Sequence, residues 1–147
     1  MTDKTNDLMT KLTATDTTEE LDKYLKDIEN KYPNDLKSYL NAIVGEKGLT
    51  LPEVLTRSGL NKTYFYQIMN GDKQNPGRDK IIAIAIACEM NLAECQRALE
   101  IAKQGILYSK SRRDSVVIYA INKKMNLMDV NSILQERNLP IIETEKK

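Results

Sequence analysis

The sequence predicts an all-α protein, on three observations. Apolar residues recur at helical spacing in most segments of the chain. Capping pairs, such as Thr50 with Glu53, mark the points where helices begin. Polar links, several of them with glycine or proline, separate the apolar segments. A chain of 147 residues with this pattern can bury a substantial core.

Residues 1–16 lack an apolar period, and we expect a flexible, Thr-rich N-terminal tail. Threonine occupies seven of the first 18 positions. Phosphorylation would add charge to such a segment, and an ordinary polar leader is the alternative. The candidate phosphorylation sites are Thr10, Thr13 and Thr15.

Residues 17–33 predict an amphipathic helix that begins with the pair Thr17 and Glu20 and ends before Pro33. Its apolar positions are Leu21, Tyr24, Leu25 and Ile28. Residues 1–33 hold 5 Lys or Arg against 8 Asp or Glu, so this part is acidic. The helix either packs on its own domain or forms an interaction element.

Residues 34–105 predict a second helical region. A first helix starts at Asn34 or Asp35 and stops at Gly48. Residues 49–71 then predict two short helices joined by a tight turn at Gly59, because glycine adopts positive φ without steric cost. We expect a polar loop after Gly71, an unusually apolar core helix over 78–89, and a helix that begins after Asn91 and closes at Gly105.

Residues 49–71 resemble the helix-turn-helix of the phage-repressor and Cro (XRE) family. The apolar positions and glycines that carry this resemblance are Val54, Gly59, Leu60, Phe65, Ile68 and Gly71. It covers roughly residues 36–100, and it implies a lambda-repressor-like domain with a recognition helix over 61–70. DNA base contacts would then come from Asn61, Lys62, Thr63, Tyr64 and Gln67. Phosphate contacts would come from Asn70, Lys73 and Arg78.

The residue types at these positions suit the reading of bases. Asn and Gln pair bidentately with adenine, Lys donates to guanine, and Thr contacts the thymine methyl group. The resemblance also implies a homodimer on double-stranded DNA, because half-sites in this family are read by paired subunits.

The C-terminal part repeats the segment before it. A shift of 35 residues, without a gap, places Arg78-Asp79 on Arg113-Asp114 and Met90-Asn91-Leu92 on Met125-Asn126-Leu127. We therefore expect a second helical hairpin over 106–142 that stacks on the first, followed by a charged tail over 143–147. Arg78 and Arg113 are expected to pair with Asp79, Asp114 or neighbouring carboxylates. The alternative is that Arg112 and Arg113 form a site for an anion or a partner.

A narrower resemblance covers residues 20–142. The chain is similar to a Firmicute-type group of proteins that are generally labelled helix-turn-helix regulators. The shared elements are residues 64–68, residues 78–80, Leu107-Tyr108 and Arg113-Asp114. Some members are associated with protein-kinase genes, which implies a protein kinase as a further partner.

Composition narrows the function classes. The chain has no histidine, which removes the commonest general base, so we expect no enzyme. Cys88 and Cys95 lie seven apart, which is not a zinc spacing, and we expect buried thiols, no metal and no cofactor. We find no run of about 18 apolar residues and no signal peptide, and therefore expect a cytoplasmic protein without a membrane partner.

Two functions from different classes follow. The first is a sequence-specific DNA-binding transcriptional regulator. The second is a protein-interaction or adaptor module on a helix-turn-helix scaffold, as a partner or substrate of a protein kinase. The net charge of only +1 favours the second, as do Leu51, where the family often carries a phosphate-binding glutamine, and the aromatic residues Tyr64 and Tyr66.

Overall fold

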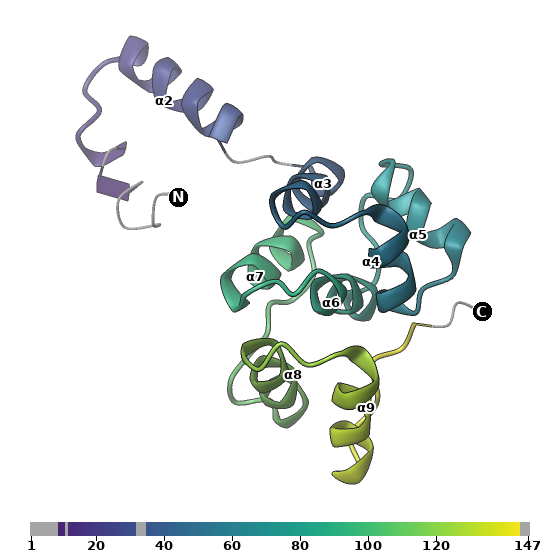
Figure 1. Cartoon of the computed structure of the whole chain (residues 1–147). Coiled ribbons are helices and arrows are strands. Elements are labelled where there is room, and N and C mark those ends of the chain that lie inside the picture. The colour runs from purple at the N-terminus through teal and green to yellow at the C-terminus, as the bar shows by residue number, and fades with distance from the viewer. Residues whose placement is uncertain (1–8, 11, 32–34, 145–147) are drawn as a thin grey trace. The chain divides into compact units, whose positions relative to one another are not determined.

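The computed structural model describes residues 9–10, 12–31 and 35–144. All regular secondary structure within these residues is helical, which confirms the all-α fold. None of the helices in the described part is long and apolar enough to cross a membrane. The chain divides into two compact units, Met1–Asn34 and Asp35–Lys147 (Figure 1).

The main element of the first unit is helix α2 (Thr18–Lys31). The Oγ1 atom of Thr17 accepts a hydrogen bond from the Glu20 N–H at 3.1 Å, as the capping pattern predicts. Leu25 is 52% exposed. Before α2 lies a helical turn that the sequence did not predict, in which Ala14 N–H donates to the Thr10 carbonyl at 3.1 Å.

The second unit begins with three short helices, each with a polar N-cap. They are α3 (Leu36–Glu46), α4 (Leu51–Ser58) and α5 (Lys62–Met69), capped by Asp35, Thr50 and Asn61. Each helix carries a fully buried side chain, respectively Leu40, Val54 and Phe65. α5 packs against α3.

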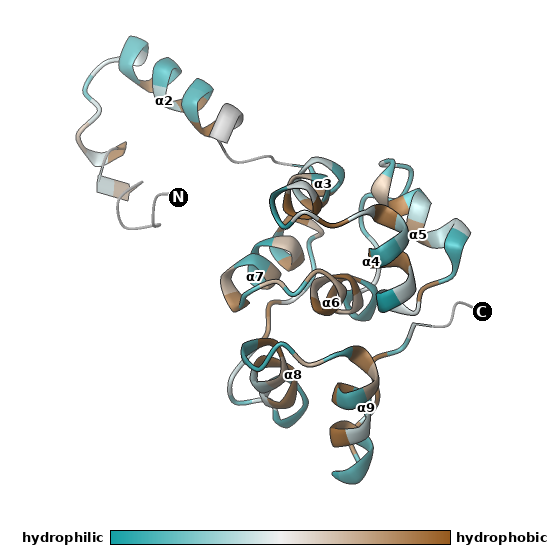
Figure 2. Ribbon diagram, in the orientation of Figure 1, coloured by the Kyte–Doolittle hydropathy of each residue, from teal (hydrophilic) through white to brown (hydrophobic). Residues whose placement is uncertain are grey.

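Helix α6 (Arg78–Ala87) is the centre of the second unit. Every residue from Lys80 to Ala87 is buried, because α6 packs against α4, α7 and α9. Figure 2 shows α6 as a mostly brown, hydrophobic helix among the others. It ends two residues before the predicted Glu89, which has a left-handed φ of 53°.

The remaining helices are α7 (Leu92–Ile101), α8 (Arg112–Asn122) and α9 (Leu127–Glu136). α7 stops before the predicted Gly105, because Lys103 takes the left-handed backbone that closes it, with a φ of 60°. α3 is fastened to α7 by an ion pair of 3.1 Å between Lys47 and Glu94.

The 35-residue repeat extends to the backbone. The bounds of α7 shifted by 35 residues are those of α9. The left-handed residues repeat as well: Glu89 corresponds to Lys124, and Lys103 to Asn138. The two hairpins, α6–α7 and α8–α9, are therefore two copies of one local structure.

Two arginine clamps join the hairpins. Arg78 donates from Nη1 and Nη2 to the Asp114 carboxylate at 2.9 and 2.8 Å. Its remaining bonds go to the Gly105 and Ile106 carbonyls.

Arg113 repeats this pattern one hairpin later. It donates to both oxygens of Asp79 at 3.0 Å and to the carbonyls of Pro140 and Ile141. The expected pairing of Arg78 and Arg113 with the two aspartates is thus confirmed, and it runs crosswise between the hairpins.

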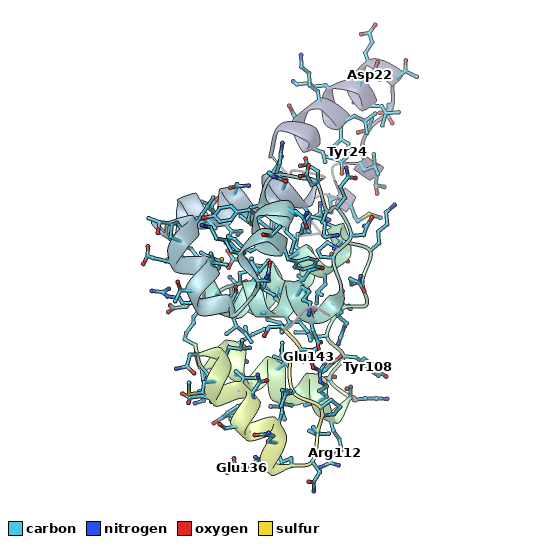
Figure 3. All side chains as sticks on the ribbon, turned by 90° about the vertical axis from the view of Figure 1, so that its right-hand side faces the viewer. Asp22, Tyr24, Tyr108, Arg112, Glu136 and Glu143 are labelled. Carbon is cyan, nitrogen blue, oxygen red and sulfur yellow. The ribbon has the colours of Figure 1, made fainter. Side chains whose placement is uncertain are left out.

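The carboxylates complete the exchange. Asp114 accepts the Tyr108 N–H at 3.0 Å, and Asp79 accepts the Glu143 N–H at 2.9 Å. Tyr108 and Glu143 are counterparts in the repeat, and both lie where the hairpins meet (Figure 3). Contacts of α6 with α9 and of α7 with α8 are reciprocal too. The hairpins therefore meet as the subunits of a two-fold symmetric dimer do, in a closed interface.

The C-terminal segment is fixed by the same repeat. Ile142 is 1% exposed, and its N–H donates to Asn131 Oδ1 at 2.8 Å. Its counterpart Leu107 makes the same bond to Gln96 Oε1 at 2.7 Å. Lys80 adds a bond of 2.8 Å from Nζ to the Glu143 carbonyl. The predicted charged tail over 143–147 is described as far as Thr144.

Candidate nucleic-acid interface

Helix α4 begins with the predicted capping box. The Thr50 N–H donates to Glu53 Oε1 at 3.0 Å, and the Glu53 N–H donates to Thr50 Oγ1 at 3.3 Å. The Thr50 backbone bond is the main cause of a lowered pKa at Glu53. Because the pair satisfies the first free amides, the start of α4 is well defined. Leu51 follows it and is half-buried.

The turn between α4 and α5 has one left-handed residue and one buried polar residue. Gly59 has a φ of 68°, as predicted. Ser58 is fully buried, donates from Oγ to the Leu55 carbonyl at 2.9 Å and accepts the Leu60 N–H at 3.2 Å. The Ser58 hydroxyl can therefore be buried without loss, since it both donates and accepts a hydrogen bond.

Three of the predicted base contacts lie at the exposed start of α5. Asn61, Lys62 and Thr63 are exposed, and Gln67 is half-buried one turn further along. Asn61 also caps the helix, because its Oδ1 accepts the Tyr64 N–H at 3.1 Å. The amide nitrogen of Asn61 is then the part of this side chain that is left for an outside acceptor.

Tyr64 differs from the prediction that it contacts bases. It is 9% exposed and belongs to the core with Phe65 and Ile68. The reason is helical geometry, because residues four apart lie on the same face of a helix. Tyr64 therefore shares the buried face of α5 with Ile68, and Phe65 shares it with Met69. The Nζ atom of Lys73 lies 5.4 Å from the centre of the Tyr64 ring.

The predicted phosphate contacts have different surroundings. Asn70 is exposed, with Oδ1 accepting the Asp72 N–H at 3.0 Å, and Lys73 is half-buried over the Tyr64 ring. Arg78, in contrast, gives four of its N–H groups to Asp114 and two carbonyls. Arg78 is therefore a clamp between the hairpins, which differs from its predicted role as a phosphate contact.

The structure places one further cation beside the loop that follows α5, at a position that the sequence did not indicate. The Lys37 side chain crosses Gly71, where a Cβ atom would lie 3.1 Å from Lys37 Cδ. Asn41 binds next to it, donating to the Met69 carbonyl at the end of α5 at 3.0 Å. No sequence signal marks Lys37, because only the packing of α3 on α5 brings it to this loop.

Other chemistry is limited in the described part. Cys88 and Cys95 are free and fully buried there, as expected. Burial raises the pKa of Cys88 to about 11 and that of Cys95 to about 12, so both are neutral thiols near pH 7. No group of three or more carboxylate or thiol side chains among the described residues is arranged to hold a metal ion.

The arrangement of α4, the Gly59 turn and α5 presents a short polar helix face beside several cations. Comparisons with protein-family models, with curated proteins and with solved structures find no match for this chain.

Proposed function

We propose that this protein is a sequence-specific DNA-binding transcriptional regulator of the phage-repressor and Cro type, in which α5 enters the major groove. The observation that carries the proposal is the split face of α5. Asn61, Lys62 and Thr63 are exposed at its start, whereas Phe65 and Ile68 are fully buried on the opposite side. A reading helix needs this combination, because its base-contacting residues must project from a fixed support.

Each polar group on and beside α5 has a role in this proposal. Lys62 donates to guanine, Asn61 and Gln67 bind adenine, and Thr63 contacts a thymine methyl group. Lys73, Asn70 and Lys37 flank α5 and bind phosphates, where they set the position on the duplex without reading its sequence.

The charge balance implies a second copy. The net charge of the whole chain is +1, so the general attraction to DNA is small. A homodimer doubles the number of base and phosphate contacts, and its two-fold symmetry matches a palindromic site. The regulator would act in the cytoplasm, the compartment that the sequence leads us to expect.

Two substitutions test the assigned face. Lys62→Ala removes a base contact, so discrimination against a changed base pair should fall by about 1–3 kcal/mol. Lys73→Ala removes a phosphate contact, so binding should weaken alike on all sequences and the salt dependence should be less steep by about one unit. Fluorescence anisotropy with labelled duplex from upstream of the protein's own gene measures both.

Lys110→Ala is the matched control, because Lys110 is an exposed lysine on the link between α7 and α8. Specific binding that survives physiological salt and depends on Lys62 supports the proposal. Binding that ignores sequence, or that is equal in all three variants, contradicts it.

An adaptor module is the second candidate, and the exposed apolar side chains of the second hairpin favour it. Tyr119 is 53% exposed and Met128 is 78% exposed, and aromatic residues and Met are enriched at protein interfaces. A protein kinase would be the partner, with Thr10, Thr13 and Thr15 as candidate substrates. Recovery of a kinase in stoichiometric amount with the purified protein, without DNA, would favour this function over the first.

A further inference from the structure

The junction between α4 and the second hairpin contains a pocket of about 560 Å³. Its lining comes from the end of α4, the end of α6, the turn between α8 and α9, and the first turn of α9. The elements meet closely here, because a Cβ atom on Gly59 would lie 3.5 Å from Leu127 Cδ2. The volume is within the range of sites that hold small organic molecules.

The lining combines an apolar wall with a charged rim. Ile86, Ala87, Met125 and Leu127 supply the apolar part. The rim has three cations, Arg57, Lys123 and Lys124, and two carboxylates, Glu89 and Asp129, which leaves a net charge of +1.

The cations differ in how firmly they are held. Lys124 Nζ donates to the Glu89 carbonyl at 2.9 Å, so it is positioned by the fold. Arg57 has only a long contact of 3.7 Å to Glu53, and its side chain is 46% exposed. Lys123 Nζ lies 5.9 Å from the centre of the Tyr119 ring. Arg57 and Lys123 can therefore turn towards a bound anion at small cost.

We propose that this pocket binds a small organic anion with an apolar body, such as an aromatic carboxylate. The apolar body packs on Met125 and Leu127, and the carboxylate binds Arg57 and Lys123. Such a ligand bridges α4 to the second hairpin, because Arg57 belongs to α4 and Lys123 follows α8. The proposal does not rest on DNA binding.

NMR titration of the full chain with 1-naphthoate tests this site. We expect saturable shifts of the Ile86, Met125 and Leu127 amides, with a Kd of roughly 1 mM or tighter. The neutral analogue 1-naphthalenemethanol should bind at least about fivefold more weakly, since it lacks the charge that pairs with the rim.

Substitution of the rim supplies the second arm. Arg57→Gln combined with Lys123→Gln should weaken 1-naphthoate about tenfold, whereas the control Lys110→Gln should not change its affinity. The spectra of the free variants show whether each has kept its fold, and Arg57→Gln alone serves if the double variant has not.

Three results would overturn the proposal. They are equal affinity of 1-naphthoate and 1-naphthalenemethanol, equal affinity of parent and rim variants, and shifts confined to residues outside the pocket. Since no DNA is present in the titration, each of these results leaves the proposed regulator function untouched.

Discussion

The hairpins α6–α7 and α8–α9 have the same backbone and the same arginine clamp, but they differ in burial. Ile84 in α6 is fully buried, whereas its counterpart Tyr119 in α8 is 53% exposed. Cys88 is fully buried, whereas its counterpart Lys123 is exposed. The first hairpin is covered by α3 and α4 as well as by its copy, and the second contacts mainly its copy. One local structure thus serves as a central layer in one place and as an outer layer in the other.

The difference shows which residues define the repeat. Positions that close each hairpin or face the other copy keep their character, as in Leu99 and Leu134, which are both fully buried. On the side that α3 and α4 cover in the first hairpin, the equivalent positions of the second hairpin are polar or aromatic. Matched substitutions in the two hairpins can therefore separate the shared interface from the added one.

The largest effect is expected where the hairpins differ most. Ile84→Ala should lower the free energy of unfolding by about 3–4 kcal/mol, because it leaves a cavity in a fully packed site. Tyr119→Ala should cost less than about 1 kcal/mol, because that side chain is half in water already. Urea denaturation followed by circular dichroism measures both, and equal losses would contradict the assignment of inner and outer layers.

The clamps should come next. Arg78→Ala removes the only cation that pairs with the Asp114 carboxylate in the described part, where this side chain is 8% exposed, and should cost about 3 kcal/mol. Arg113→Ala exposes Asp79, which is already 24% exposed, and should cost about 2 kcal/mol.

Arg112→Ala is the control for both clamps, because Arg112 is exposed at the start of α8, and it should change stability by less than about 0.5 kcal/mol. Urea denaturation curves of the three variants measure these losses of stability. A clamp variant that is as stable as Arg112→Ala would show that its ion pair does not hold the hairpins together.

A third effect depends on pH. Burial alone would raise the pKa of Asp114, but the hydrogen bonds from Arg78 and from the Tyr108 N–H outweigh it and hold the pKa below its usual value of 3.8. The ionised carboxylate therefore stabilises the fold above that value, and this stabilisation is lost as pH falls through the lowered pKa.

Asp114→Asn should lower the free energy of unfolding by about 2 kcal/mol at pH 6. The difference in this free energy between parent and variant should become smaller below about pH 3.8. Unfolding free energies of parent and variant across this range provide the measurement. The control Asp72→Asn, at an exposed loop position, should change stability at pH 6 by less than about 0.5 kcal/mol. A gap that widens as the pH falls would give the opposite sign and contradict the argument.

The smallest effects concern the side chains that hold the two extended segments. Gln96 makes two bonds to Leu107, and Asn131 makes one bond to Ile142. Gln96→Ala should therefore cost about 1–2 kcal/mol, and Asn131→Ala about 1 kcal/mol. Thermal unfolding can resolve this order. A larger loss in Asn131→Ala would indicate that the C-terminal segment contributes more than its counterpart.

Local signals in the sequence are enough to place most of the helices. Capping pairs, apolar spacing and the turn glycines placed the helices to within a few residues, because these signals act within one or two turns of the chain. The repeat was visible as well, since Arg78-Asp79 and Arg113-Asp114 are 35 residues apart without a gap. The close of α7 was the main error, because Lys103 rather than a glycine adopts the left-handed backbone.

The surroundings of individual side chains, in contrast, depend on how the helices pack. Contacts between helices distant in the sequence bury Tyr64 and place Lys37 beside Gly71. They also determine that Arg78 and Arg113 pair crosswise with the aspartates of the other hairpin. Helical periodicity marks a face as apolar or polar, but it does not say how wide a stripe the neighbours cover. The width of the buried stripe is set by packing. Packing leaves the start of α5 exposed, whereas it engages Arg78 in the clamp.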